Sequence, residues 1–266
     1  MLNFKKMVST EIDNGYNEIT APAKVCQDII LKAISVGNLR HNITIKGGVV
    51  MRSKTGNIRR ATQDLDMDFL RYPLTDEAID EFVTKMNCLD GIRIERIGII
   101  EELKQQEYRG KRIYIRILDS NGYEIESKID LGVHSKLDIS QEEYCFDIAL
   151  DDEGVNLLIN SNEQMLVEKL RSLLKFGAQS TRYKDVFDID YLGRHVDFKK
   201  LHACLDSYIF SDKQMKENNM IDVQNRVGQI FSDKLYMKRL STSKKNWTDE
   251  SVAKIIRNIT AFFKSL

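Results

Sequence analysis

The amino-acid sequence predicts an α/β fold of the α+β kind: a mixed sheet with helices, followed by an all-helical C-terminal region. Alternating and β-branched runs concentrate between residues 92 and 159, whereas beyond residue 160 apolar residues recur at helical spacing. Because a sheet must bury a face against another layer, the helical segments of the first part are expected to cover it. We therefore expect two domains, residues 1–155 and residues 156–266.

Composition narrows the class of protein. The 266 residues carry 40 Lys and Arg against 40 Asp and Glu, so any nucleic-acid contact would depend on a local basic patch rather than on net charge. The four cysteines and four histidines show no zinc-binding spacing. No long apolar segment or signal peptide is recognisable. We expect a soluble, cytoplasmic protein with no membrane partner.

The expected elements follow from capping residues, glycines and periodicity. In the first part they are a helix from Thr20 to Gly37, a strand at 42–46, a short helix at 49–53, a loop at 54–62, a strand at 64–70 and a helix capped by Thr75. The β-rich block contains strands at 92–100, 111–118 and 123–131 and short strands at 143–147 and 155–159, with a hairpin turn at Asn121-Gly122.

The helical part begins with a capping box. Ser161 and Gln164 have the spacing in which each side chain caps the other's backbone at a helix start. Further helices are expected at 181–193, 198–210, 221–232 and 248–264.

The most informative stretch runs from residue 45 to residue 69, where a glycine pair precedes alternating aspartates. Successive side chains of a strand point to opposite faces, so Asp64, Asp66 and Asp68 share one face and the apolar residues between them share the other. Carboxylates crowded on one face repel one another unless a cation compensates them. This pattern predicts a site for Mg²⁺ (or Mn²⁺), which prefers oxygen ligands.

Two further features support this site. Gly47 and Gly48 allow a phosphate to approach the backbone closely. Asp130, at the end of the strand at 123–131, is the candidate third carboxylate, although that side chain could equally belong to a solvated sheet face. Asp68 has two interpretations, as a support for the metal ligands or as a cap. A glycine pair followed by Asp-x-Asp on a strand is typical of the nucleotidyltransferase fold.

The sequence resembles the AbiEii/AbiGii-type nucleotidyltransferase toxins of type IV toxin–antitoxin and abortive-infection systems, which include the MenT toxins. The first matching motif is Lys46-Gly47-Gly48 followed by Arg60-Ala61-Thr62-Gln63-Asp64-Leu65-Asp66. The second is Glu168-Lys169-Leu170-Arg171-Ser172 followed by Arg182-Tyr183-Lys184-Asp185-Val186-Phe187-Asp188, with Leu192 completing it. Ser172 replaces the usual alanine. The resemblance covers residues 40–192.

The resemblance implies a metal-dependent transfer of a nucleotide from an NTP, with the C-terminal domain contributing Lys169 and Asp185 to the cleft. The expected metal ligands are Asp64, Asp66 and Asp130. The expected catalytic residues are Asp64, Asp66, Asp130, Lys169 and Asp185, and the expected nucleotide-binding residues are Lys46, Gly47, Gly48, Arg52, Thr62, Lys169 and Arg182. The implied acceptor is the 3′ end of an RNA, tRNA in this family, and the implied partner is a separately encoded antitoxin.

Several alternatives remain open at this stage. From spacing alone Lys169 reads as a lysine whose head reaches solvent, whereas the resemblance places it at the nucleotide's phosphates. The basic stretch at 234–245, with Tyr236 inside it and Trp247 just beyond, would either grip an RNA backbone or form a charged linker. The competing functions are transfer to a small molecule or protein and nucleotide binding without turnover.

Overall fold

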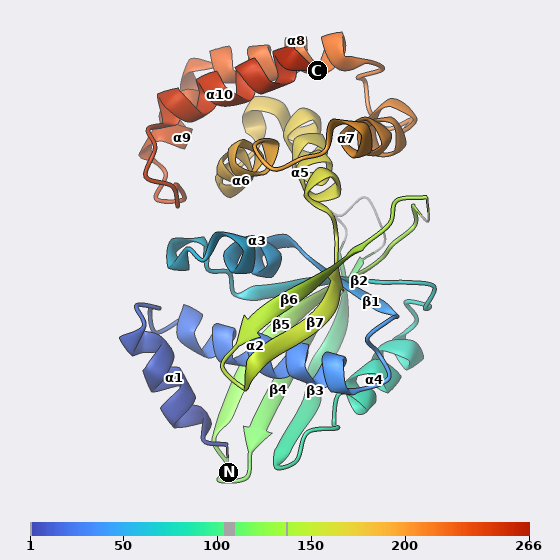
Figure 1. Ribbon diagram of the computed structural model, residues 1–266, viewed down its shortest axis with the longest axis vertical. Helices are drawn as coiled ribbons and strands as arrows, with labels where there is room; N and C mark the ends of the chain where they lie inside the picture. The colour runs from blue at the N-terminus through green and yellow to red at the C-terminus, as the bar shows by residue number, and fades with distance from the viewer. Residues whose placement is uncertain (1, 104–109, 137) are drawn as a thin grey trace. The chain divides into compact units, whose positions relative to one another are not determined.

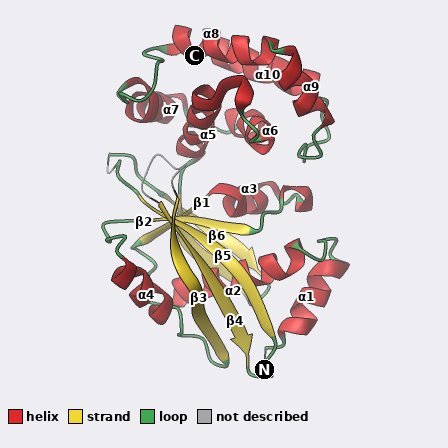
Figure 2. Cartoon of the chain, turned by 180° about the vertical axis from the view of Figure 1, so that it is seen from behind, coloured by secondary structure: helices red, strands yellow, loops and turns green. Residues whose placement is uncertain are grey.

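The computed structural model describes residues 2–103, 110–136 and 138–266, which form ten α-helices and one seven-stranded sheet (Figure 1). The chain divides into two compact units, Met1–Asn160 and Ser161–Leu266. The whole sheet belongs to the first unit and the second is helical (Figure 2). The predicted fold class is therefore confirmed. The division falls five residues beyond the expected position, because strand β7 (Asp151–Ile159) continues past residue 155.

The sheet has the strand order β3-β4-β5-β2-β1-β7-β6. Its other strands are β1 (Ile43–Lys46), β2 (Asp64–Phe69), β3 (Ile92–Leu103), β4 (Gly110–Asp119), β5 (Glu124–Val133) and β6 (Glu142–Ile148). Strand β2 has one neighbour of each kind, because β1 is antiparallel to it and β5 is parallel, as in a mixed sheet. The parallel pairing arises because α4 and the β3–β4 hairpin intervene between β2 and β5, returning the chain in the same direction.

Four helices belong to the first unit: α1 (Phe4–Asp13), α2 (Thr20–Val36), α3 (Gly47–Thr55) and α4 (Asp76–Lys85). Helix α4 packs on the apolar face of the sheet, where the Phe82 ring lies edge-on to Phe69 at 5.4 Å between centroids. Helix α2 crosses the strands and contacts β5 and β7 (Figure 1). Helix α3 starts at the glycine pair and contacts β1 and β2. The apolar side chains of β2, β4 and β5 are thereby removed from water.

The second unit contains α5 (Asn162–Phe176), α6 (Tyr183–Gly193), α7 (Phe198–Leu205), α8 (Met220–Ser232), α9 (Lys234–Thr242) and α10 (Val252–Ser265). The Ser161 side chain accepts a hydrogen bond from the Gln164 amide, as the capping box predicts. The charged-linker interpretation of residues 234–245 is wrong over most of its length. Helix α9 forms there because Asp233 caps it, accepting from the Tyr236 amide, and Tyr236 and Leu240, one turn apart, are both buried.

Burial also settles the role of the two aromatic residues near the basic stretch. Tyr236 is fully buried, and Trp247 is buried with its indole N–H donating to the Asp188 carboxylate at 2.9 Å. Neither ring is available to stack on an RNA base. Within the described residues no helix is both long enough and apolar enough to cross a membrane.

Candidate active site

Strand β2 presents its aspartates and its apolar residues to opposite sides of the sheet. Leu65, Met67 and Phe69 are buried in the core, whereas Asp64 and Asp66 are half-buried. The alternation follows from the two-residue period of a strand. The apolar face therefore fixes the register of β2, and the register holds the carboxylates on the opposite face.

Asp130 reaches the same face from the neighbouring strand. In the parallel pairing of β2 with β5, Asp66 lies opposite Asp130 and Asp64 lies opposite Lys128. The apolar residues of β5 on either side of Asp130, Ile129 and Leu131, are fully buried. The structure thus brings Asp64, Asp66 and Asp130 together on two adjacent strands, and we call these three residues the carboxylate row.

Basic side chains from the sheet neutralise part of this face. The Arg112 guanidinium donates from Nε to Asp130 Oδ1 at 2.7 Å and from Nη2 to Asp130 Oδ2 at 2.8 Å. This fork raises the pKa of Arg112 above its usual range. The Lys128 ammonium lies 3.0 Å from Asp64.

Asp68 does not extend the carboxylate row outward but lies buried beside it. Its Oδ1 accepts from the Lys46 ammonium at 2.6 Å. A Cβ on Gly132, which lies opposite Asp68 on β5, would come within 2.2 Å of that oxygen, so only glycine leaves room for the pair. The structure therefore places Asp68 as the anchor of Lys46, one of the residues expected at the nucleotide.

The glycine pair lies directly against the carboxylates. Gly47 has φ +67°, and a Cβ there would approach Asp66 Oδ2 to 2.2 Å. A Cβ on Gly48 would meet the Thr62 side chain at 2.7 Å. Gly47 and Gly48 are also the first residues of α3, where backbone N–H groups have no partner inside the helix and favour anions. The missing side chains thus bring a potential phosphate site next to Asp66.

Two of the expected nucleotide-binding residues occupy different settings. The backbone of Thr62 is held by α2, because its carbonyl accepts a hydrogen bond from the Gln27 side-chain amide at 2.9 Å. Arg52 is buried instead, with Nη1 donating to the Tyr16 hydroxyl at 3.2 Å. The structure thus buries Arg52 inside the first unit, because its position on α3 directs it toward the segment between α1 and α2.

The second motif forms a compact centre of its own in the second unit. The Lys169 ammonium lies 2.8 Å from Asp188 and 3.2 Å from Asp185. Arg182 Nε donates to the other oxygen of Asp185 at 2.6 Å. The side chains of Lys169, Asp185 and Asp188 are only 8%, 9% and 0% exposed, so the reading of Lys169 as a lysine with a solvated head is wrong. We call these three residues the lysine centre.

The carboxylate row offers suitable donors for a metal ion, but its carboxylates are not arranged as a complete set of ligands. Among the residues that the structure describes, no three acidic, histidine or cysteine side chains are grouped closely enough to hold an ion as they stand. Asp64 and Asp66 nevertheless present half-exposed carboxylates on one face, with the hard oxygen donors that Mg²⁺ and Mn²⁺ prefer. The chemistry and the placement of Asp64 and Asp66 therefore fit such an ion. Arg112 and Lys128 neutralise part of the negative charge of the row in this structure.

The sequence did not reveal Arg112 as part of this site. Alternation within residues 111–118 places Arg112 on one face of its strand, but the strand's partner and register decide what it touches. The antiparallel pairing of β4 with β5 sets Arg112 directly opposite Asp130. The contact of Lys128 with Asp64 likewise depends on the register between β5 and β2, which the sequence does not show.

We compared the chain with protein families and with known proteins. Residues 29–255 match the family described as the nucleotidyl transferase AbiEii toxin of type IV toxin–antitoxin systems. Among solved structures, the chain is similar to the antibiotic-resistance factor ANT(2'')-Ia in solution, at 14% identity and a TM-score of 0.43, covering 71% of this chain and 92% of that one. No curated protein matches the chain.

The family match spans most of the chain and includes both motifs. The chain is therefore a nucleotidyltransferase, an enzyme that takes an NTP as substrate. It belongs to the AbiEii toxin family of type IV toxin–antitoxin systems.

Proposed function

We propose that this protein transfers a nucleoside monophosphate from an NTP to the 3′ hydroxyl of an RNA, a tRNA by family resemblance, with the help of Mg²⁺ or Mn²⁺. The observation that carries the proposal is the placement of Asp66, which lies opposite Asp130 and against Gly47. Carboxylates for a metal and a backbone site for phosphate thus adjoin at one point of the sheet. We expect the protein to act in the cytoplasm and to be restrained by a separately encoded antitoxin.

In this proposal Asp64 and Asp66 would hold the divalent ion, and its chemistry there would be to polarise the phosphate and offset the charge that develops during transfer. Asp64 and Asp66 supply half-exposed oxygens, and Asp130 lies beside them to orient the attacking hydroxyl and take its proton. The backbone N–H groups at Gly47 and Gly48 bind the β- and γ-phosphates, and Thr62 adds a hydroxyl at the same place. Positioning and electrostatics supply most of the catalysis.

We extend the proposal to the lysine centre through the family motif. Lys169 would offset charge on the departing pyrophosphate, while Asp185 fixes Lys169 and Arg182 in place. Within the second unit these groups already touch one another, as that role requires.

An RNA acceptor needs a local basic surface, because the chain has no net charge. Lys234 and Lys238 on α9, and Lys244 and Lys245 after it, are exposed and point to such a surface. Phosphate contacts of this kind give affinity without sequence preference.

The direct test is transfer of label. We would incubate the protein with Mg²⁺, each α-labelled NTP in turn, and total bacterial RNA and protein. We expect label on a tRNA-sized band, lost in Asp66→Asn and retained in Glu126→Gln, which changes a carboxylate on the same face of β5 but outside the row. Label on a protein or small molecule would contradict the RNA acceptor, and NTP binding without transfer would contradict turnover.

A further inference from the structure

We propose that Arg112 takes the place of a second divalent ion in this site. In this arrangement Arg112 is a fixed counter-ion that keeps Asp130 in position, and the site holds a single divalent ion between Asp64 and Asp66. The inference rests on the proposed function and specifies its metal requirement. It makes Arg112 a positioning residue for the reaction.

The contact between Arg112 and Asp130 occupies both carboxylate oxygens. Nε and Nη2 donate to Oδ1 and Oδ2 at 2.7 and 2.8 Å, the parallel fork that arginine forms with a carboxylate. The Asp130 side chain is only 8% exposed and that of Arg112 is 25% exposed. A metal ion that bound both oxygens of Asp130 would have to displace the Arg112 guanidinium, which is three-quarters buried and makes two hydrogen bonds to that carboxylate.

Asp64 is held much more loosely than Asp130. Its partner Lys128 makes one 3.0 Å contact, and the two side chains are 33% and 30% exposed. Ion pairs as exposed as this contribute little free energy, and a lysine ammonium can move back into water on its flexible stem. An incoming divalent ion would therefore displace Lys128 from Asp64 and leave Arg112 on Asp130.

The same β4–β5 ladder provides an internal comparison. Arg116 lies opposite Glu126, just as Arg112 lies opposite Asp130. Arg116, however, directs Nε and Nη2 to a single oxygen, Oε1 of Glu126, at 3.3 and 3.0 Å. The Glu126 side chain is also 53% exposed. Of these two arginines, only Arg112, beside the carboxylate row, donates to both oxygens of a shielded carboxylate.

Charge balance leads to the same number of ions. The three carboxylates of the row carry three negative charges, which Arg112 and one divalent ion neutralise together once that ion has displaced Lys128 from Asp64. A second divalent ion would leave the row with excess positive charge before any substrate bound. The row therefore suits one metal ion, because Arg112 supplies the remaining positive charge from the sheet itself.

The test is the number of Mn²⁺ ions that the full chain binds without nucleotide, measured by electron paramagnetic resonance of free Mn²⁺. We expect one ion for the wild type and for Arg116→Met, and two for Arg112→Met, whose freed Asp130 becomes a ligand. Lys128→Met should still bind one ion, about tenfold more tightly, because a competing cation close to Asp64 has been removed.

Two ions on the wild-type protein, or a single ion on a folded Arg112→Met variant, would overturn the inference. If Arg112→Met does not fold, Asp130→Asn supplies the test: the ion should remain, because Asp64 and Asp66 hold it, and its loss would overturn the inference. The proposed function fails separately, since it requires label transfer: a wild type that transfers label with two bound ions contradicts only the role of Arg112.

Discussion

The carboxylate row with its partners Arg112 and Lys128, and the lysine centre, both bring opposite charges together, but Asp64 of the row is held less firmly than the charges around Lys169. The Lys128–Asp64 pair of the sheet is about one third exposed, whereas the side chains around Lys169 are almost completely shielded. Partly exposed pairs exchange partners at little cost, while a buried charge that loses its partner is strongly destabilising. The comparison shows that the partner of Asp64 can be exchanged at little cost, whereas the lysine centre holds the Lys169 ammonium firmly in place.

The largest effect should follow from removing a carboxylate of the row. Asp66→Ala should lower nucleotidyl transfer by roughly 10³-fold, because metal stabilisation of developing charge is worth several kcal/mol and each 1.4 kcal/mol or so is tenfold. Its melting temperature should change little, since Asp66 is half-buried. Single-turnover rates and thermal unfolding measured on the same samples check both parts. Substantial unfolding would show that the row is structural.

The lysine centre should show the opposite behaviour, with a large effect on stability. Lys169→Met leaves Asp188 without its ammonium partner in a buried site, and we expect a loss of about 3–5 kcal/mol in the free energy of unfolding. Lys128→Met is the matched control on the sheet and should cost less than about 1 kcal/mol. Urea unfolding of both variants gives the comparison. Equal losses would remove the distinction between the two clusters.

The glycine pair allows a finer test of the row. Gly47→Ala should reduce transfer by roughly 10–100-fold, as displacing a supporting contact of a metal site does, because the added Cβ displaces Asp66. Gly56→Ala is the control: Gly56 also has a positive φ, +60°, but its Cβ would meet nothing within 4 Å. Both glycines have a positive φ that costs a non-glycine residue about 1–2 kcal/mol, so the difference in rate between the two variants reports mainly on the contact with Asp66. Equal rates would contradict it.

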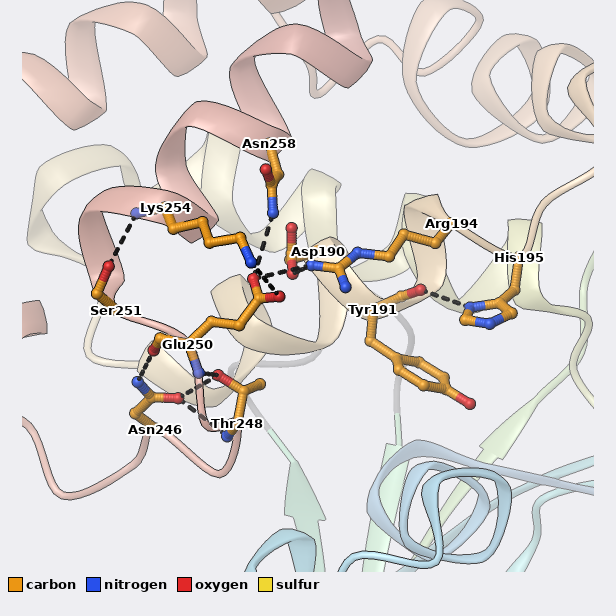
Figure 3. A network of polar contacts seen from close by, with 10 residues as sticks. All are labelled: Asp190, Tyr191, Arg194, His195, Asn246, Thr248, Glu250, Ser251, Lys254 and Asn258. Carbon is orange, nitrogen blue, oxygen red and sulfur yellow. Dashed lines mark hydrogen bonds and ion pairs between the residues drawn. The ribbon is translucent and has the colours of Figure 1, made fainter.

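The smallest predicted effect concerns pH and the buried charges of the second unit. Asp190 lies in a network with Arg194, Glu250 and Asn258 that joins α6 to the start of α10 (Figure 3). Burial raises the pKa of Asp190, and hydrogen bonding to Asn258 and the charge of Arg194 only partly oppose it. The folded protein therefore binds this proton more readily than the unfolded chain does.

The sign of the pH effect follows from that preference. Stability contributed by Asp190 is present below the unfolded pKa of about 3.9 and is lost as the pH rises through the raised folded pKa. The unfolding free energy of the wild type relative to Asp190→Asn should therefore fall as the pH increases over this window. Denaturant melts at closely spaced pH values measure it, and a rise with pH would contradict the shielding of Asp190.

Local patterns were sufficient to predict most of the fold, including the strand that carries Asp64 and Asp66. The alternation in β2 predicted the buried face of Leu65, Met67 and Phe69, and the cap at Ser161 predicted the start of α5. Helix α9 was not predicted, because the lysines of this segment suggested a charged surface stretch and only two of its residues, Tyr236 and Leu240, are buried.

Pairing between strands was beyond the reach of sequence patterns. Whether β2 runs parallel or antiparallel to β5, and which side chain lies opposite Asp130, depend on the whole topology. Arg112 became visible only through that register. The burial of Arg52 against Tyr16 likewise depends on how α1, α2 and α3 pack together.

The most direct test of the central claim is a crystal structure with Mn²⁺ and a non-hydrolysable NTP analogue, with the metal located by its anomalous scattering. We expect a peak within coordination distance of the Asp64 and Asp66 carboxylates, the triphosphate at the start of α3, and Arg112 still on Asp130. A metal bound away from Asp64 and Asp66, or a triphosphate away from Gly47 and Gly48, would contradict the assignment of the carboxylate row as the site of nucleotidyl transfer.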